Sequence, residues 1–135
     1  MPGSPFPSPD MQMTLLLVVD DVERSKAWYV DVLGATVYRE YGGSSCVLRF
    51  LDNWLLLVTG GEPSDDKPTV SMAAAADFDR VSAEVTVRVP DCQGAYETLR
   101  DRGADFLTPP VNWGPEIRAF FRDPDGHLWE ISQTG

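Results

Sequence analysis

Residues 18–35 read VVDDVERSKAWYVDVLGA. The apolar run Met13–Val19 ends inside this stretch and predicts a buried strand, after which Asp20-Asp21 supply an N-cap for a helix. From Val22 to Leu33 the apolar side chains fall mostly on one helical face, and Gly34 provides the stop. The stretch therefore predicts a strand, a helix and a helix end, in that order.

The same order returns later in the chain. Val85–Val89 alternates like a strand, and the helix that follows it runs from Pro90-Asp91 to about Arg102. Asp21 matches Asp91 at an offset of 70 residues, and Gly34 matches Gly103 at an offset of 69. An offset that hardly drifts over a strand, a helix and its stop indicates two copies of one structural unit.

Three short strands are expected after each helix. They cover Ala35–Tyr41, Cys46–Leu51 and Trp54–Thr59 in the first copy, and Ala104–Leu107, Ile117–Arg122 and His127–Ser132 in the second. One such unit cannot bury both faces of its sheet, so two units should share a core or pair across a dimer. Residues 60–69 predict a polar loop, residues 70–79 leave helix and extended chain open, and the proline-rich residues 1–10 predict a flexible lead-in.

Composition narrows the class of protein and its partners. The chain has 135 residues, which suits one domain, and a formal net charge of -10, which repels nucleic acid and anionic membranes. The longest apolar run is too short to cross a bilayer. Cys46 and Cys92 are expected to be free thiols in a reducing interior, so we expect a cytoplasmic protein.

Three motifs in order carry a family resemblance. They are VVDDVERSKAWYVDVLGA (18–35), VRVPDCQGAYETLRDRGADFLTPP (87–110) and WGPEIRAFFRDPDGHLWEIS (113–132). Over about residues 13–133 they resemble the glyoxalase/bleomycin resistance protein/dioxygenase family, also called the vicinal oxygen chelate superfamily. The resemblance implies an α+β fold in which two βαβββ modules form curled mixed sheets around a cavity. It places a single domain at residues 11–135, with modules at about 13–60 and 82–134 and a linker at 61–81.

The resemblance also implies where a metal would bind. Enzymes of the family hold a divalent metal through ligands on the first and last strands of each module, usually His or Glu. Carried over to this chain, these positions fall on Thr14, Leu57, Glu84 and Glu130. Leucine cannot ligate a metal, and Zn²⁺ or Ni²⁺ would find no nitrogen or sulfur donor here. We therefore expect no metal cofactor of the usual kind, with Glu84 and Glu130 as weak candidates for holding a hard cation.

The remaining candidates surround the C-terminal hairpin. Residues 127 and 130 have opposite parity along a strand, so His127 is expected at the surface and away from Glu130. Arg118 and Arg122 share a parity, and either could neutralise Glu130 from the same side of the sheet. Trp113 is expected near the cavity mouth, where an indole stacks on a planar or cationic ligand. Trp28, Trp54 and Trp129 are expected in the core.

Several functions fit these residues. The first is binding of a small cationic or aromatic molecule in an acidic cavity without the usual His-containing metal site. The candidate ligand-binding residues are Thr14, Leu57, Glu84, Trp113, Arg118 and Glu130. The alternative is a lyase, isomerase or dioxygenase-like enzyme of the same superfamily, with a divalent metal on Glu84 and Glu130, or with Glu130 as general base. A third is an interaction module with a vestigial pocket. The resemblance also implies a homodimer.

Overall fold

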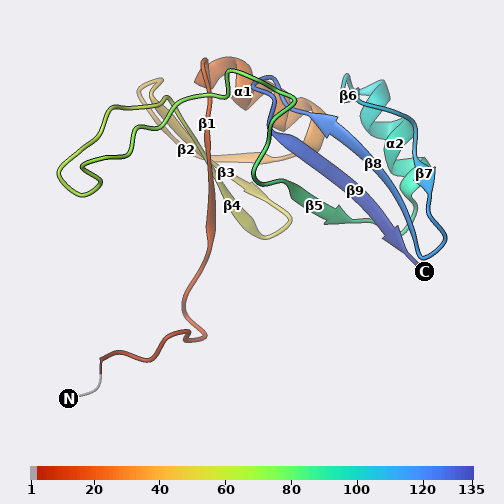
Figure 1. The fold of residues 1–135 in the computed structure, drawn as a ribbon, viewed down its shortest axis with the longest axis horizontal. Helices are drawn as coiled ribbons and strands as arrows, with labels where there is room; N and C mark the ends of the chain where they lie inside the picture. Colours follow the sequence, from red (N-terminus) through yellow and green to blue (C-terminus); the bar gives the residue numbers. More distant parts are fainter. Residues whose placement is uncertain (1–2) are drawn as a thin grey trace.

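A computed structural model describes residues 3–135 and shows two modules, each with a sheet and one helical segment (Figure 1). The first module contains β1 (Thr14–Val18), α1 (Val22–Trp28) with a π-helical continuation η1 (Tyr29–Leu33), β2 (Thr36–Tyr41), β3 (Ser45–Phe50) and β4 (Asn53–Val58). Its strands are ordered β1-β4-β3-β2, with β1 parallel to β4 and the other pairs antiparallel.

The second module repeats this plan. It contains β5 (Val85–Arg88), α2 (Cys92–Asp101), β6 (Asp105–Phe106), β7 (Val111–Asn112), β8 (Glu116–Arg122) and β9 (Leu128–Thr134). Its sheet is ordered β5-β9-β8-β6, with β5 parallel to β9 and β7 paired to β8. The predicted fold class is confirmed. The sequence did not predict β7, which splits the module's second strand in two because Pro109-Pro110 interrupts the pairing.

Local side-chain chemistry sets the limits of both helices. The Asp21 carboxylate accepts the backbone N–H of Arg24 at 3.1 Å, and the Asp91 carboxylate accepts that of Gly94 at 3.0 Å. Both residues are therefore the N-caps that the sequence predicted. Gly34 ends the first helical segment with φ of 78°, in the left-handed region that glycine enters without strain.

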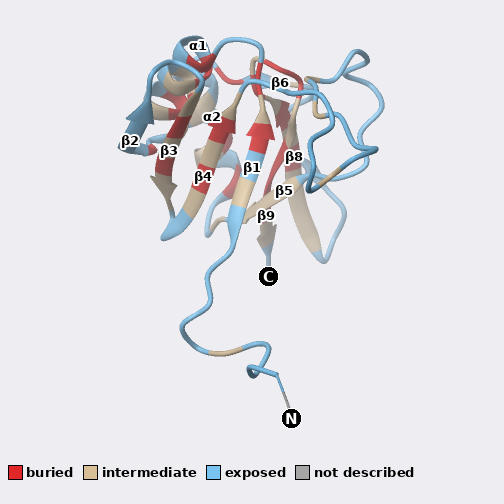
Figure 2. Cartoon of the chain, turned by 90° about the vertical axis from the view of Figure 1, so that its left-hand side faces the viewer, coloured by how far each residue is buried: buried red, intermediate tan, exposed pale blue. Residues whose placement is uncertain are grey.

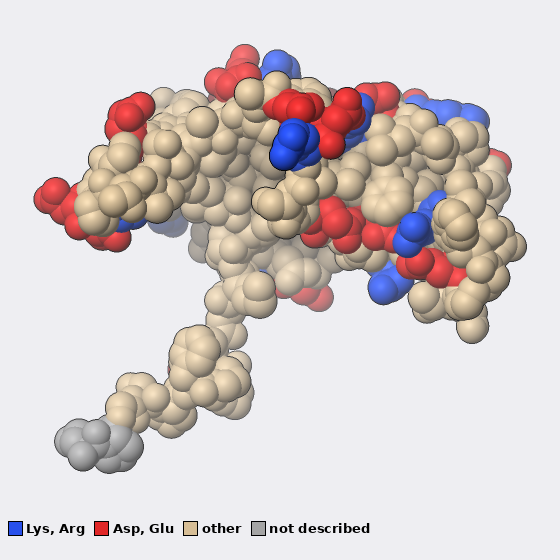
Figure 3. Space-filling view, viewed as in Figure 1, with Lys and Arg blue, Asp and Glu red and all other residues tan. Residues whose placement is uncertain are grey.

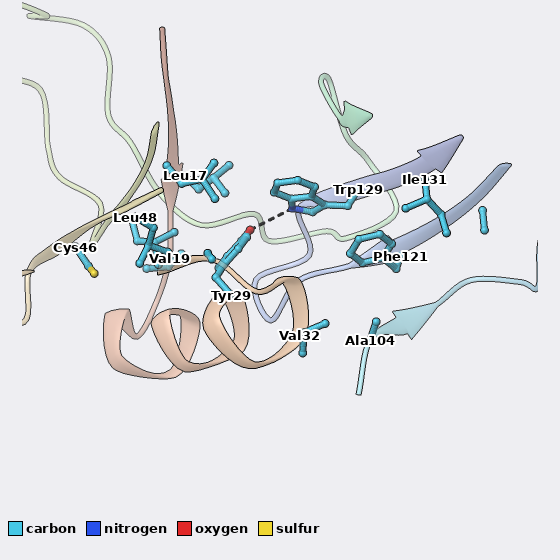
Figure 4. Close-up of a cluster of buried hydrophobic side chains, with 14 of the residues drawn as sticks. Leu17, Val19, Tyr29, Val32, Cys46, Leu48, Ala104, Phe121, Trp129 and Ile131 are labelled. Atoms are coloured by element: carbon cyan, nitrogen blue, oxygen red, sulfur yellow. Dashed lines mark hydrogen bonds between the residues drawn. The ribbon is translucent and has the colours of Figure 1, made fainter. Parts of the chain in front are cut away.

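The core lies between the helices and the inner faces of the two sheets (Figures 2 and 4). Trp129 is buried and contacts Tyr29 of η1, so the last strand of one module packs on the helical segment of the other. Trp28 also packs against this core, with its ring centroid 6.2 Å from that of Phe121. The expectation for Trp54 was wrong: it is half-buried on the other face of β4, because its neighbour Leu55 takes the inward direction.

Two segments lack regular structure. Residues 3–13 run away from the sheets as a tail (Figures 1 and 2), and residues 59–84 contain only the isolated bridges Gly61–Met72 and Ser64–Lys67. Residues 70–79, left open by the sequence, are therefore neither helix nor strand. Along residues 3–135 the helices are too short or too polar to span a bilayer.

Candidate functional site

A groove separates the two sheets where their edge strands β1 and β5 face each other. It holds a cavity of about 380 Å³ lined mainly by apolar side chains from β1, the β3–β4 turn, β5 and Trp129. The polar residues on its wall are Thr14, Asn53, Thr86 and Arg88. This volume and mixture of side chains suit a small organic molecule.

Two carboxylates meet at Thr86, the side chain that connects them to the wall of this cavity. The Thr86 hydroxyl oxygen lies 2.6 Å from Glu84 Oε1 and 2.8 Å from Glu130 Oε1. A hydroxyl has one proton to donate, so it satisfies one carboxylate, and the second contact is favourable when the other carboxyl group is protonated and donates to the oxygen. The structure thus joins Glu84 and Glu130 through Thr86, a residue that the sequence did not identify.

The environment favours the neutral form of Glu130. The residue is only 6% exposed, and this burial raises the pKa of its carboxyl group. The negative charges of Glu84 and Glu116 raise this pKa further, while the hydrogen bond from Thr86 acts in the opposite direction. Glu130 is therefore a buried acid whose ionisation is disfavoured until a cation or a proton donor reaches it.

The structure moves one of the predicted positions by one residue. Glu130 pairs with Thr86 across β9 and β5, and the corresponding pair across β4 and β1 is Leu56 with Leu16. Leu57 is fully buried among core side chains and does not line the cavity. The match of Glu130 to Leu57 is therefore wrong by one residue, and strand parity places its counterpart at Leu56.

The donor set does not fit a borderline transition metal. Thr14 lies on the cavity wall with a neutral hydroxyl, and the positions Leu56 and Leu57 both offer only hydrocarbon. Over residues 3–135, no three side chains of His, Cys, Asp or Glu come together in a group that could hold a metal ion. Glu84 and Glu130 supply two oxygen donors, the kind that hard cations accept.

His127 is not the surface residue that the sequence predicted. Its side chain is three-quarters buried, and Nδ1 lies 2.7 Å from Asp123 Oδ2. Burial alone would lower the pKa of His127, but the hydrogen bond and negative charge of Asp123 outweigh this effect and raise it. The turn before β9 closes around the buried Asp123 carboxylate, which also accepts the His127 backbone N–H at 2.8 Å.

The same turn accepts hydrogen bonds from the helical segment of the first module. Tyr29 donates its hydroxyl to Asp123 Oδ2 at 2.5 Å and accepts the indole N–H of Trp129 at 3.1 Å. The neighbouring carboxylate of Asp125 accepts the Ser25 hydroxyl at 2.9 Å. The sequence identified the Asp-Pro-Asp-Gly segment only as a turn, because nothing in its spacing reveals partners near residue 29.

The two arginines of β8 have partners other than Glu130. Arg118 Nη1 lies 3.4 Å from Glu116 Oε1, and Arg122 Nη2 lies 2.5 Å from Asp79 Oδ1. The hypothesis that either neutralises Glu130 is therefore wrong. Trp113 is 62% exposed, and its ring centroid lies 5.5 Å from the Arg118 guanidinium carbon. The indole thus stacks on a cation from its own chain.

Comparisons with known proteins agree with this architecture. The sequence pattern of the Glyoxalase/Bleomycin resistance protein/Dioxygenase superfamily matches residues 12–131. A probable lactoylglutathione lyase of Synechocystis sp. is 24% identical over 129 residues, covering 88% of this chain and 92% of that protein. A lactoylglutathione lyase of Salmonella typhimurium is 25% identical over 126 residues, covering 88% of this chain and 89% of that protein.

Solved structures extend the similarity to the fold. A glyoxalase/bleomycin resistance protein/dioxygenase from Alicyclobacillus acidocaldarius superposes with a TM-score of 0.70 at 18% identity, covering 95% of this chain and 94% of that one. TioX from Micromonospora sp. ML1 superposes with a TM-score of 0.68 at 26% identity, covering 93% and 99% respectively. Paired modules with a groove between their sheets define a small α+β protein. The chain belongs to the glyoxalase/bleomycin resistance protein/dioxygenase superfamily.

Proposed function

We propose that this protein binds a small organic molecule whose apolar or aromatic body occupies the groove between β1 and β5 and whose cationic group reaches Glu130. One observation carries the proposal: a nearly buried carboxyl group shares a threonine hydroxyl with a second carboxyl group beside an apolar cavity. An amine would donate hydrogen bonds to the oxygens of both carboxyl groups, for which the Thr86 hydroxyl has only one proton.

Charge and apolar surface act together in this proposal. An ionised Glu130 loses water hydration on burial, and this cost raises the pKa of its carboxyl group in the free protein, so a bound cation would offset it. The apolar walls supply the non-directional part of the affinity. The net charge of -10 raises the local concentration of cations around the protein.

Calorimetry with benzylamine tests the proposal. We expect saturable binding to the native protein, and at least about tenfold weaker binding to Glu130→Gln, since a buried charge-assisted hydrogen bond is worth 1.5–3 kcal/mol. Glu97→Gln is the matched control, because Glu97 is an exposed acid on α2. Equal affinity of benzylamine for the two variants would refute the proposal.

The lyase relatives and the raised pKa of Glu130 favour a second candidate, an enzyme in which Glu130 is the general base. A hard cation held by Glu84, Glu130 and water would belong to this alternative. Calorimetry with Mg²⁺, Mn²⁺ and Ni²⁺ separates the two candidates. Stoichiometric metal binding that Glu84→Gln and Glu130→Gln both abolish would favour the enzyme over the metal-free binding protein.

Two further parts of the proposal concern the state of the protein in the cell. We infer a cytoplasmic homodimer, supported by free buried cysteines at positions 46 and 92 and by exposed Leu16 and Tyr38 on the open face of the first sheet. Light scattering on the eluted peak of a sizing column tests the oligomeric state. A mass of one 14.9 kDa chain at all concentrations would contradict the dimer.

A further inference from the structure

The face of the second sheet that carries Glu130 also carries Arg88 and Arg118. Strand pairing places Thr86, Glu130 and Phe120 in one row across β5, β9 and β8, and Arg88, Ser132 and Arg118 in the next row. The rows are two residues apart along each strand, a separation of about 7 Å. Figure 3 shows acidic and basic side chains lying side by side on this face.

Arg118 is held in place but still accessible. Its guanidinium carbon lies 5.5 Å from the ring centroid of Trp113 and 5.4 Å from that of Phe120. The side chain remains 39% exposed. Its five N–H groups make one hydrogen bond to an acceptor within residues 3–135, the 3.4 Å contact with Glu116. Stacking therefore fixes the plane of the guanidinium while most of its donors stay free.

Glu116 occupies the space between the two arginines. Its carboxylate lies 3.2 Å from Arg88 Nη1 and accepts the Ser132 hydroxyl, and Arg88 Nη1 donates to the Ser132 oxygen at 2.5 Å. The hydrogen bond from Ser132 and the two positive charges lower the pKa of Glu116, so this group is ionised. Two arginines against one carboxylate leave one uncompensated positive charge in this row.

We propose that the row Arg88–Ser132–Arg118 is an anion subsite and that the ligand is a zwitterion. Its cationic group lies at Glu84 and Glu130, and a carboxylate or similar anion lies at Arg118 and Arg88, about 7 Å away, the spacing of the two rows. The planar guanidinium of Arg118 matches a carboxylate with two parallel N–H donors. This inference rests on the proposed function for the cationic end of the ligand, but the anion subsite can be tested alone.

Glu116 is an internal competitor for this subsite. Its side chain reaches the arginines from the end of β8, next to the free donors of Arg118, so an incoming carboxylate shares or replaces its contacts. When no ligand is bound, Glu116 compensates one of the two arginine charges. Removing the Glu116 charge should consequently tighten the binding of an anion instead of weakening it.

Three probes built on one benzene ring test the proposal. Benzoate carries only the anion, benzylamine only the cation, and 4-(aminomethyl)benzoate holds both charges at opposite ends of the ring. Affinities come from NMR chemical-shift titrations at constant ionic strength. For the native protein we expect the zwitterion to bind about tenfold more tightly than either single-charge probe, as one further charge-assisted contact allows.

Substitutions then assign the contacts. Arg118→Gln should weaken benzoate and the zwitterion about tenfold and leave benzylamine unchanged, whereas Glu116→Gln should tighten benzoate about threefold or more. Arg100→Gln is the matched control, since the guanidinium carbon of Arg100 lies 5.0 Å from the ring centroid of Tyr96, in α2 on the opposite face of the sheet. It should change none of the three affinities.

The outcomes separate the two proposals. If benzoate binds Arg118→Gln as it binds the native protein, or never saturates, the anion subsite is refuted whatever benzylamine does. If the zwitterion binds no better than benzylamine, the two charges are not engaged together and the ligand class is wrong. Failure of benzylamine to respond to Glu130→Gln refutes the proposed function and the cationic end of the zwitterion, but the anion subsite stands, because the effect of Arg118→Gln on benzoate does not depend on Glu130.

Discussion

Replacing Tyr29 with Phe removes one oxygen atom from the contact between the two modules. Tyr29 is fully buried and donates its hydroxyl to Asp123. Its hydroxyl also accepts the indole N–H of Trp129 (Figure 4). The ring itself is kept, so no apolar contact is lost. The substitution therefore isolates the energetic contribution of two hydrogen bonds that join η1 to the turn before β9 and to β9 itself.

The expected cost follows from these two bonds. Loss of a hydrogen bond to a charged acceptor costs about 1.5–3 kcal/mol, and a buried donor left without an acceptor costs about 1–3 kcal/mol. The Trp129 indole N–H becomes such a donor, because Trp129 is 1% exposed. Since neighbouring effects are not additive, we expect Tyr29→Phe to lower the free energy of unfolding by about 3 kcal/mol, a large part of a typical total of 5–15 kcal/mol.

Urea unfolding followed by tryptophan fluorescence measures this change as a shift of the midpoint at constant slope. Tyr38→Phe is the matched control, because Tyr38 is 60% exposed and makes no side-chain hydrogen bond to residues 3–135. It should change the free energy of unfolding by less than about 0.5 kcal/mol. A Tyr29→Phe protein as stable as the control would refute the view that this hydroxyl fastens the modules together.

Three other predictions concern single side chains. Asp123 raises the pKa of His127 in the folded state, so the stabilisation by protonated His127 is complete below the unfolded pKa and is lost as the pH rises through the folded pKa. His127→Gln should therefore flatten this part of a plot of urea midpoint against pH. Burial raises the pKa of Glu130, so the stability of the protein falls as the pH rises from the unfolded to the folded pKa of this group. At neutral pH Glu130→Gln should therefore unfold at a higher urea concentration than the native protein, and an unchanged midpoint would contradict this reasoning. Leu57→Ala should lower the free energy of unfolding, measured with urea, by about 2–5 kcal/mol because Leu57 is fully buried, and Leu56→Ala should lower it clearly less. The reverse order would contradict the register of β4.

Local physics explains why so much of the fold could be predicted. Asp21 and Asp91 cap helices through backbone N–H groups three residues away, and Gly34 ends a helix through its own left-handed backbone. None of these effects needs a distant partner. Their repetition about 70 residues apart predicted two modules, and the superfamily match over residues 12–131 agrees with that prediction.

The polar face of the second sheet could be predicted only in part. Alternation along single strands predicts that Thr86 and Arg88 share the side of Glu84, and that Glu116 and Phe120 share the side of Arg118. This parity predicted that Arg118 and Arg122 share one side of their strand, whereas Thr86 was not predicted as a site residue. What parity cannot provide is the order of the strands, and the rows that place Arg118 beside Ser132 exist only through the pairing of β8 with β9.

The sequence by itself therefore determined the modules, their helix ends and the presence of two acids at the ligand positions that the resemblance implied, because each depends on residues that are close together in the chain. Only the tertiary structure decided which of these side chains meet. Tyr29 and Asp123 are 94 residues apart in the chain, and Thr86 and Glu130 are 44 apart. Such contacts are set by how two sheets pack and pair, and the resulting burial raises the pKa of the Glu130 carboxyl group.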